Sequence, residues 1–221
     1  MRPEKKPDGQ KQSSFIQEAR RAQIIESAIE TFTELGYAGT SLAHIAERAG
    51  ISKGVISYHF AGKTELMEQI VEQVYRDIAR FVVPRTERET TAARALRANI
   101  RAVAEYMRGH RSQLLALGEI FNNFRASDGR KRYGVAFNEP IYRDRETLFR
   151  LGQQNGEFRS FDPRVMSITV QAAIDDMFAY WVTYPDHDLE AHAEELADLF
   201  EHAARAEPPG KADPPGETAN R

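Results

Sequence analysis

Cysteine is absent from this 221-residue chain, and no stretch approaches the roughly 18 consecutive apolar residues that a membrane-spanning helix needs. Without cysteine the chain has no disulfide framework, no Cys-ligated zinc or iron–sulfur site and no thiol nucleophile. The polar N-terminal segment MRPEKKPDGQKQSS is not followed by the apolar core of a secretory signal. The lack of a membrane-spanning stretch and of a secretory signal predicts a cytoplasmic protein without a membrane partner, whereas the lack of cysteine is neutral about compartment.

A large excess of one charge is also lacking, since 30 Lys and Arg residues oppose 33 Asp and Glu residues. The distribution is uneven, however. Residues 1–63 hold nine basic and seven acidic residues, a balance of +2, whereas the remaining 158 hold 21 and 26, a balance of -5. A basic end on an acidic body favours a polyanion as the partner of that end. A charged tail that serves solubility explains the same imbalance equally well.

Strand signals are scarce, because no sustained alternation of apolar and polar residues occurs and no Asn-Gly or Asp-Gly turn joins two apolar runs. Helical periodicity instead predicts helices throughout. They are expected over residues 16–35, 41–49, 53–59, 63–82, 89–108, 112–126, 139–154, 163–183 and 188–205. The predicted fold class is all-α, with an N-terminal three-helix helix-turn-helix head on a larger antiparallel helical body.

Composition sets the outer boundaries of these two parts. Residues 1–14 mix Pro, Gly, Lys and Gln and are expected to form a disordered basic arm. Residues 206–221 hold four of the ten prolines and are expected to form a disordered tail. The head is then expected over residues 15–62 and the body over residues 63–205.

Residues 40–63, TSLAHIAERAGISKGVISYHFAGK, carry the most informative pattern in the chain. Two short helices joined by a tight turn that contains glycine predict a helix-turn-helix. Ala46 is small enough for the two helices to cross, and Gly50 supplies the left-handed conformation that ends the first of them. The side chains expected to point inward are Leu42, Ile45, Ala49, Ile51, Ile56 and Phe60.

The outward face of the helix over residues 53–59 is unusual for a purely structural helix. Gly54 costs about 1 kcal/mol relative to alanine in a helix, which is reasonable where another backbone comes close. Thr40 and Ser52 are expected N-caps, and helix N-termini attract anions. Further hydrogen-bonding groups follow at Ser57, Tyr58 and His59. The pattern suits a helix in the major groove of DNA, although the two aromatic side chains are also compatible with closing the corner of a three-helix core.

Residues 17–63 resemble the DNA-binding domain of the TetR family of bacterial transcriptional regulators. The matching residues are Leu35-Gly36-Tyr37, Thr40-Ser41-Leu42, Ile45-Ala46, Ala49-Gly50-Ile51-Ser52-Lys53-Gly54, and Tyr58-His59-Phe60 with Lys63 after them. The resemblance implies a DNA-binding head over residues 15–62 and an effector-binding and dimerisation body over residues 63–205. It also implies a ligand-responsive regulator, most often a repressor, which binds a palindromic operator as a dimer and is released by a small molecule.

The resemblance also implies a role for individual residues of the head. Phosphate contacts are implied for Thr40 and Ser52, through N-caps and hydroxyls, and for Tyr58, His59 and Lys63. Contacts with base edges or the adjoining backbone are implied for Lys53, Gly54, Val55 and Ser57. Many relatives carry Thr or Ala in place of Val55 and Tyr in place of Ser57. Because valine offers only apolar contact and serine reaches less far than tyrosine, base preference is expected to depend on Lys53 and on DNA shape.

The body places bulky residues beside polar ones, as a small-molecule site requires. The candidate effector-binding residues are Tyr106, Glu119, Phe121, Asn122, Phe124, Asp176, Phe178 and Trp181. Carboxylates near aromatic faces favour an effector that is aromatic or lipophilic and cationic. Core packing explains the aromatic residues as well, and solvated helix faces are the simpler interpretation of Glu119 and Asp176.

The helices over residues 163–183 and 188–205 are the expected homodimer contacts. Both are apolar over more than one face and therefore need partners on two sides. Pairing them from two chains gives a four-helix bundle with two-fold symmetry, which sets two recognition helices about 34–36 Å apart, the spacing of successive major grooves. Effector binding is then expected, by the resemblance, to tilt the helix over residues 63–82 and to spoil that spacing.

No cofactor, no metal and no catalytic site are expected. His187 and His192 are conceivable metal ligands, but their spacing along the chain favours an ordinary helix-capping segment. The chain has no glycine-rich phosphate loop and neither of the hydrolase motifs G-x-S-x-G and H-E-x-x-H. The alternative to a regulator is a helical binding protein or enzyme whose three-helix head contacts other proteins.

Overall fold

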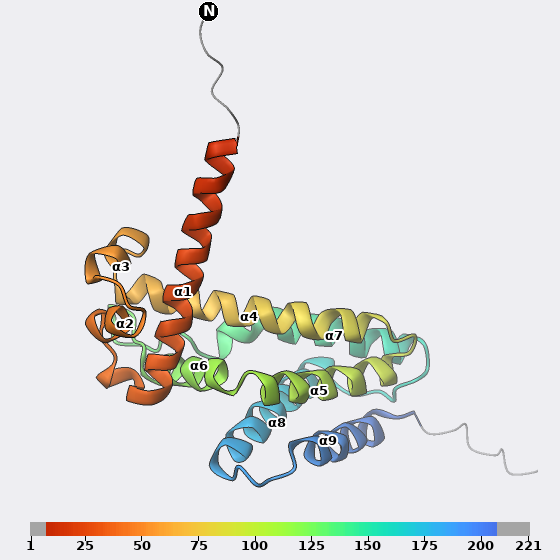
Figure 1. Ribbon diagram of the computed structural model, residues 1–221. Helices are drawn as coiled ribbons and strands as arrows, with labels where there is room; N and C mark the ends of the chain where they lie inside the picture. The colour runs from red at the N-terminus through yellow and green to blue at the C-terminus, as the bar shows by residue number, and fades with distance from the viewer. Residues whose placement is uncertain (1–7, 207–221) are drawn as a thin grey trace, which may run out of the picture. The chain divides into compact units, whose positions relative to one another are not determined.

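The structure, a computed structural model, describes residues 8–206, with side chains from residue 15 onward. The described part is all-α, as the sequence predicts, and contains nine α-helices and one short 3-10 helix (Figure 1). The helices are α1 (Asp8–Gly39), α2 (Leu42–Arg48), α3 (Lys53–His59), α4 (Lys63–Glu87), α5 (Ala92–Gly109), α6 (Arg111–Asn123), η1 (Val135–Asn138), α7 (Glu139–Gln154), α8 (Pro163–Thr183) and α9 (Leu189–Ala204).

Three predicted boundaries are wrong. Helix α1 begins at Asp8, so residues 8–14 are helical where a disordered arm was expected. Helix α4 continues through Pro84 to Glu87 instead of ending before the proline; the missing N–H and the clash of the proline ring with the preceding turn weaken a helix or kink it without always ending it. Helix α6 ends at Asn123, since Phe124 already has an extended backbone. Residues 1–7 and 207–221, including most of the predicted tail, lie outside the described residues.

The chain forms two compact units. The first comprises the chain up to Phe81 together with Tyr106–Asn138, and the second comprises Val82–Glu105 and the chain from Glu139 onward. Helices α4 and α5 contribute to both units. The first unit thus contains more than the predicted head, because α6 and most of α4 pack with α1, α2 and α3. The functional division between residues 62 and 63 stays a prediction.

The core of the first unit is built from the apolar face of α1 and the residues that face it. Ile24, Ala28 and Phe32 of α1 are buried, as are Ile56 and Phe60. The predicted inward positions are thus buried or half-buried. Helix α1 is broken at Gly36, which has φ 64° and ψ -179°. A left-handed φ of this kind is readily available only to glycine, so Gly36 turns the chain where the sequence predicted the helix to stop.

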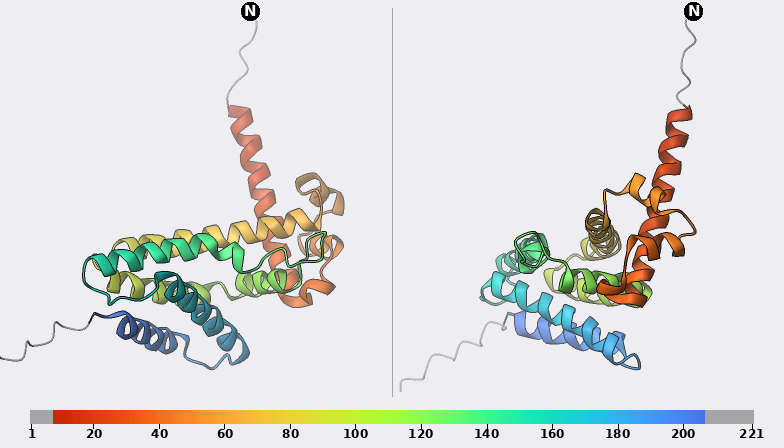
Figure 2. Two further views of the ribbon diagram at one scale, coloured as in Figure 1. Left: turned by 180° about the vertical axis from the view of Figure 1, so that it is seen from behind. Right: turned by 90° about the vertical axis from the view of Figure 1, so that its left-hand side faces the viewer.

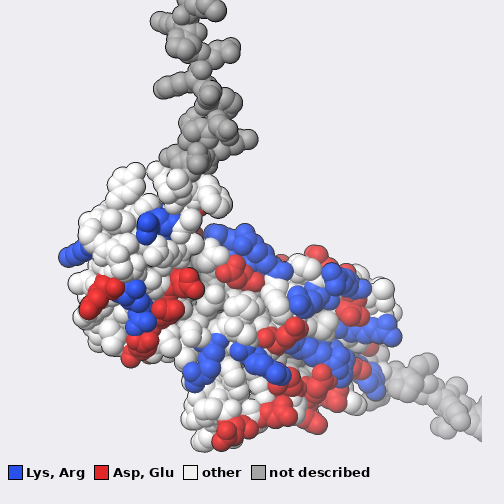
Figure 3. All heavy atoms as spheres, in the orientation of Figure 1, with Lys and Arg blue, Asp and Glu red and all other residues white. Residues whose placement is uncertain are grey.

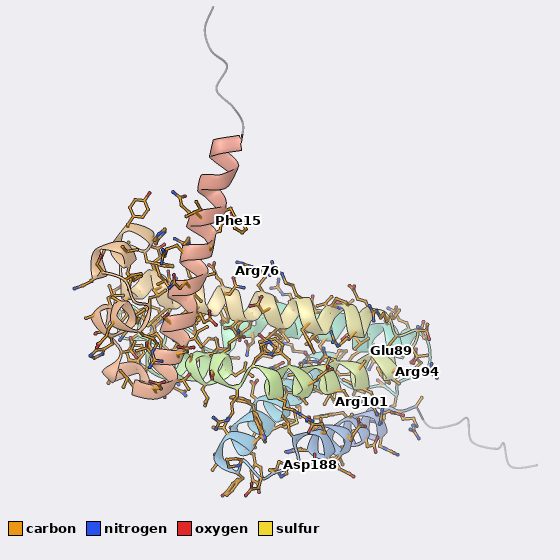
Figure 4. The ribbon with its side chains drawn as sticks, in the orientation of Figure 1. Phe15, Arg76, Glu89, Arg94, Arg101 and Asp188 are labelled. Atoms are coloured by element: carbon orange, nitrogen blue, oxygen red, sulfur yellow. The ribbon has the colours of Figure 1, made fainter. Side chains whose placement is uncertain are left out.

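The second unit is held together by the packing of α7 on α8 and of α8 on α9. Arg145 of α7 is buried and donates hydrogen bonds to the Ser167 carbonyl oxygen and to Oε1 of Gln171, both at 3.2 Å. Burial lowers the pKa of Arg145 to about 10. On the surface, Arg97 and Arg101 of α5 pair with acidic side chains of α9, so that basic and acidic residues alternate there (Figures 3 and 4). No helix of the described part is long and apolar enough to cross a membrane.

Candidate nucleic-acid interface and effector residues

The turn between α2 and α3 has the geometry that the sequence predicts. Gly50 adopts φ 65°, and its N–H donates to the Glu47 carbonyl at 3.1 Å while the N–H of Ile51 donates to the Ala46 carbonyl at 3.0 Å. These bonds satisfy the last carbonyls of α2, as a left-handed C-terminal glycine does. The turn therefore fixes the angle at which α3 leaves α2.

One face of α3 is buried and the other is open. The Ser52 hydroxyl accepts the Val55 N–H at 3.4 Å, so Ser52 is the N-cap that the sequence predicts. Ile56 is fully buried. The exposed residues of the predicted DNA-binding set are Ser52, Lys53, Gly54, Ser57 and Tyr58, and the half-buried ones are Val55 and His59. The structure thus brings seven of the nine predicted residues together on one short segment.

Lys53 and Gly54 are available at the start of this open face. The Lys53 side chain is exposed and has no hydrogen bond or ion pair within the described part of the chain. A Cβ at Gly54 would meet only the Ser52 hydroxyl, at 3.6 Å, so packing within the protein does not require glycine there. Tyr58 is 73% exposed, and its ring stands edge-on to that of His59 with centroids 5.0 Å apart.

Two side chains of α1 hold α2 and α3 in place, and no sequence pattern indicated either role. The Arg21 guanidinium donates to the His59 carbonyl oxygen and lies 4.3 Å from the centre of the Phe60 ring. The Gln23 amide donates to the Ala49 carbonyl oxygen at 3.0 Å. These contacts cap the C-terminal ends of α3 and α2, whose last carbonyls otherwise have no partner. Arg21 is therefore a positioning residue.

Thr40 and Lys63, the other two predicted DNA-binding residues, lie outside the segment over residues 52–59. Ser41, rather than Thr40, is the N-cap of α2 and accepts the His44 N–H at 3.2 Å, so the predicted capping role of Thr40 is wrong. Thr40 is 3% exposed, and its hydroxyl donates to the Gly36 carbonyl at 2.7 Å.

The Lys63 ammonium donates to the carbonyl oxygens of Tyr37 and Thr40, at 2.9 and 2.6 Å. It also lies 4.5 Å from the centre of the Tyr37 ring. Burial lowers the pKa of Lys63. Lys63 thus ties the start of α4 to the segment between α1 and α2, which the sequence did not indicate. Its predicted contact with phosphate stays a prediction.

Five of the predicted effector-binding residues lie in the first unit. Tyr106 is 2% exposed; its hydroxyl donates to Oε1 of Gln113 at 2.7 Å, and its ring stacks on His110 with centroids 3.9 Å apart. Burial raises the pKa of Tyr106 to about 12. Phe121 and Phe124 belong to one aromatic cluster, whose other members are Tyr75, Tyr133 and Phe137.

Glu119 and Asn122 do not form one site with that aromatic cluster. The Glu119 carboxylate accepts the Tyr37 N–H at 2.8 Å, immediately after the break in α1, and Asn122 is exposed. Glu119 therefore joins α6 to α1. An open cleft of about 300 Å³ lies between α1 and α2, lined by Thr31, Leu35, His44, Glu47 and Arg48, none of which was predicted to bind an effector.

The other three predicted effector residues lie on α8 in the second unit. Asp176 is exposed, whereas Phe178 and Trp181 are half-buried, with ring centroids 6.2 Å apart. Nearby, His187 Nε2 and His192 Nδ1 are 2.9 Å apart, so the two imidazoles meet despite their spacing along the chain. The described residues contain no group of three or more His, Cys, Asp or Glu that could hold a metal ion. The effector role of all eight residues stays a prediction.

Comparison with known proteins agrees with this geometry. Residues 24–70 match the family described as "Bacterial regulatory proteins, tetR family". The HTH-type transcriptional regulator BetI of Burkholderia mallei (strain NCTC 10229) is 40% identical over 88 residues, which cover 40% of this chain and 44% of BetI. The matched region therefore spans less than half the length of that relative.

Solved structures share the fold over most of the chain. The fatty acid degradation regulator FadR from Bacillus halodurans covers 93% of this chain and 100% of its own, with a TM-score of 0.72 and 18% identity. FadR from Bacillus subtilis, in complex with stearoyl-CoA, covers 81% of this chain and 96% of its own, with a TM-score of 0.71 and 22% identity. The helix-turn-helix geometry and the match over residues 24–70 show that this region of the chain is of the TetR family of bacterial regulatory proteins, and the solved structures show that the fold is shared over most of the chain.

Proposed function

We propose that the protein is a transcriptional regulator, and most simply a repressor, which binds a palindromic DNA operator as a homodimer and leaves it when a small-molecule effector binds. The exposed face of α3 is the observation that carries the proposal. Lys53, Ser57 and Tyr58 point away from the core, and nothing within the first unit explains such a set on a short, well-anchored helix. The proposal includes no catalytic step and places the protein in the cytoplasm, where the bacterial chromosome lies.

The DNA-binding step is tested with a duplex selected from a random-sequence library and a shuffled duplex of the same composition. Lys53→Ala is expected to lower affinity for the selected duplex by about 1–3 kcal/mol, roughly 5- to 150-fold, and to lower affinity for the shuffled duplex much less. Arg143→Ala is the control, because Arg143 is an exposed arginine on α7. Equal losses on both duplexes would contradict base contact by Lys53, and no DNA binding at low salt would refute the proposed function.

Dimerisation is proposed through α8 and α9. Helix α8 buries Val170, Ile174 and Met177 within its own unit, whereas Val165 is 61% exposed. On α9, Leu199 is 65% exposed. A helix that is apolar on a second, uncovered face needs another partner, and a second copy of the same chain satisfies that need on both helices at once.

Sedimentation equilibrium tests this interface. The wild-type protein is expected at twice 25.1 kDa, about 50 kDa, and Leu199→Glu is expected to shift it to the monomer mass and to weaken operator binding. Leu151→Glu is the matched control, since Leu151 is 50% exposed on α7. A dimer that persists in Leu199→Glu and dissociates in Leu151→Glu would place the interface elsewhere.

Helix α6 is the proposed route from the effector to the head. It packs against α1, and its Glu119 carboxylate holds the Tyr37 N–H just beyond the break at Gly36. A ligand shifts the protein away from DNA only if it binds the two states with different affinity. We propose that the effector displaces α6 and so moves α1, together with the predicted tilt of α4.

The effector itself is proposed to be a small molecule with an aromatic or lipophilic, cationic character, which contacts predicted aromatic residues of the body. Native mass spectrometry of the purified protein tests whether such a molecule is retained. Tyr106→Ala and Trp181→Ala are expected to alter release from the selected duplex while leaving affinity for it nearly unchanged. If these variants change only the free energy of unfolding, both residues are core residues and the proposed effector site is wrong.

A further inference from the structure

The segment between α6 and η1 is an ordered basic loop that the proposed DNA contacts leave unexplained. We define the basic loop as residues 125–132, RASDGRKR, which carry four basic residues and one acidic residue, a net charge of +3. Within it, Arg125 and Lys131 form an isolated antiparallel bridge, and the Ala126 N–H donates to the Arg130 carbonyl at 2.9 Å. The loop therefore has a defined, hairpin-like backbone.

Both ends of the basic loop are anchored in the core of the first unit. Phe124 is 5% exposed and Tyr133 is 7% exposed, and the Tyr133 ring stacks on Phe121 with centroids 5.1 Å apart. Arg132 donates to one carboxylate oxygen of Glu68 from both Nε and Nη2, at 3.1 and 2.9 Å. Phe124, Tyr133 and Arg132 thus hold the basic loop in place.

The remaining basic side chains have no comparable structural role. Arg130 is 88% exposed, and within residues 15–206 its one acidic neighbour is Asp128, at 3.8 Å. Lys131 is exposed and has no ion pair in the described part of the chain, and Arg125 is exposed with a single long bond of 3.4 Å to a backbone oxygen. An ion pair as exposed as that between Arg130 and Asp128, with 3.8 Å between its nitrogen and oxygen atoms, contributes little to the stability of the fold. The charges are therefore available to an anionic partner.

The anchor at Glu68 places the basic loop beside the start of α4. Glu68 lies five residues after Lys63, which is about 7.5 Å along an α-helix at 1.5 Å per residue, and Lys63 follows α3 after a short corner. The view from behind shows the loop between α6 and α7 at the same end of α4 as α2 and α3 (Figure 2, left). All these elements belong to one compact unit, and we infer from this placement that a duplex engaged by α3 extends past the loop.

We propose that Arg125, Arg130 and Lys131 of the basic loop contact phosphates of the bound DNA duplex, outside the segment that α3 occupies. This rests on the proposed DNA-binding function and adds a contact that the helix-turn-helix does not supply. Phosphate contacts position a protein on DNA without reading sequence, and each contact adds about 0.9 to the slope of log affinity against log salt.

The test is the salt dependence of binding to a 30-base-pair duplex of mixed sequence, on the full chain, for which no operator needs to be known. Arg130→Gln combined with Lys131→Gln is expected to make the slope shallower by about 1.8, so that the loss of affinity is about tenfold larger at 50 mM than at 200 mM salt. The control, Arg143→Gln combined with Arg150→Gln, removes two arginines from α7 that are 74% and 60% exposed. It is expected to leave the slope nearly unchanged.

A second measurement separates direct contact from a general effect of charge. Because the chain lacks cysteine, Ser127→Cys carries a single fluorophore on the loop without removing a basic residue, and Ser160→Cys carries one in the second unit. DNA is expected to protect the first fluorophore from a soluble quencher and to leave the second accessible.

The outcomes are distinct. Wild-type slopes in the loop variant, or equal quenching at both labels, overturn the loop contact and leave the proposed function standing. Loss of vesicle binding, measured with phosphatidylserine–phosphatidylcholine vesicles, with unchanged DNA binding would make an anionic membrane the partner and likewise overturn the inference. Failure of the wild-type protein to bind any duplex at low salt refutes the proposed function and the loop contact together.

Discussion

Gly36→Ala is the substitution whose effect the structure specifies best. Gly36 has φ 64° and ψ -179°, a combination that is essentially restricted to glycine. The break it makes in α1 frees the Tyr37 N–H, which donates to Glu119 of α6 at 2.8 Å. A side chain at this position therefore affects both the path of the chain into α2 and the bond between α1 and α6.

The expected cost has two parts. Holding a non-glycine residue in this backbone region costs about 1–3 kcal/mol. If the backbone relaxes instead, the charge-assisted bond from Tyr37 to Glu119 is lost, at about 1.5–3 kcal/mol. Steric conflict adds little, because the new Cβ would lie 3.4 Å from the Glu119 oxygen. We expect about 2–3 kcal/mol, which corresponds to a decrease in Tm of roughly 4–12 °C for a chain of this size.

Substitutions at two other glycines provide reference values for this loss of stability. Gly50→Ala is expected to cost about 1–2 kcal/mol, because φ is 65° but nothing lies within 4 Å of the new Cβ. Gly62→Ala is expected to be nearly neutral, since Gly62 has neither a positive φ nor a close neighbour. Unfolding in urea, followed by far-UV circular dichroism at one protein concentration, gives the free energy of unfolding of all three variants. If Gly36→Ala costs no more than Gly62→Ala, the assigned backbone strain is wrong.

Three further substitutions test individual contacts. Thr40→Val is expected to cost about 1 kcal/mol of stability, through loss of the bond to the Gly36 carbonyl, and to leave DNA affinity unchanged in an anisotropy assay; the reverse pattern would mean that the hydroxyl reaches a phosphate. Tyr106→Phe is expected to cost about 1 kcal/mol through loss of the bond to Gln113. The substitution also removes a loss of stability that wild type shows as the pH rises above 10. The pKa of Tyr106 is raised from 10.0 to about 12, so the unfolded state ionises while the folded state still holds its proton. A variant that loses stability above pH 10 as wild type does would contradict this. Arg164→Met is expected to make the stability of the fold less sensitive to acid. Hydrogen bonds from Arg164 lower the pKa of Glu139 and Glu146, so these carboxylates stabilise the fold above pH 4.5, and this stabilisation is lost as the pH falls through the lowered pKa values. Equal acid sensitivity of variant and wild type would contradict this reasoning.

The sequence predicted those features that depend on residues close together in the chain. Helix periodicity identified the fold class, and the spacing of Ala46 and Gly50 identified the turn between α2 and α3 with its left-handed glycine. The burial of Ile56 beside exposed Lys53 followed from the same period. Boundaries were less accurate, because the neighbours of a helix, rather than its own residues, decide whether it continues through a proline or beyond a polar segment.

The sequence by itself determined that the chain is helical, where its helix-turn-helix lies and which face of that motif is open. Only the tertiary structure showed that Arg21 and Gln23 cap α3 and α2 and that Glu119 joins α6 to α1. It alone placed the basic loop beside α4, through Glu68. The reason is physical: periodicity records contacts between residues a few positions apart, whereas a hydrogen bond between Glu119 and Tyr37 crosses 82 positions, and nothing in either segment alone specifies its partner.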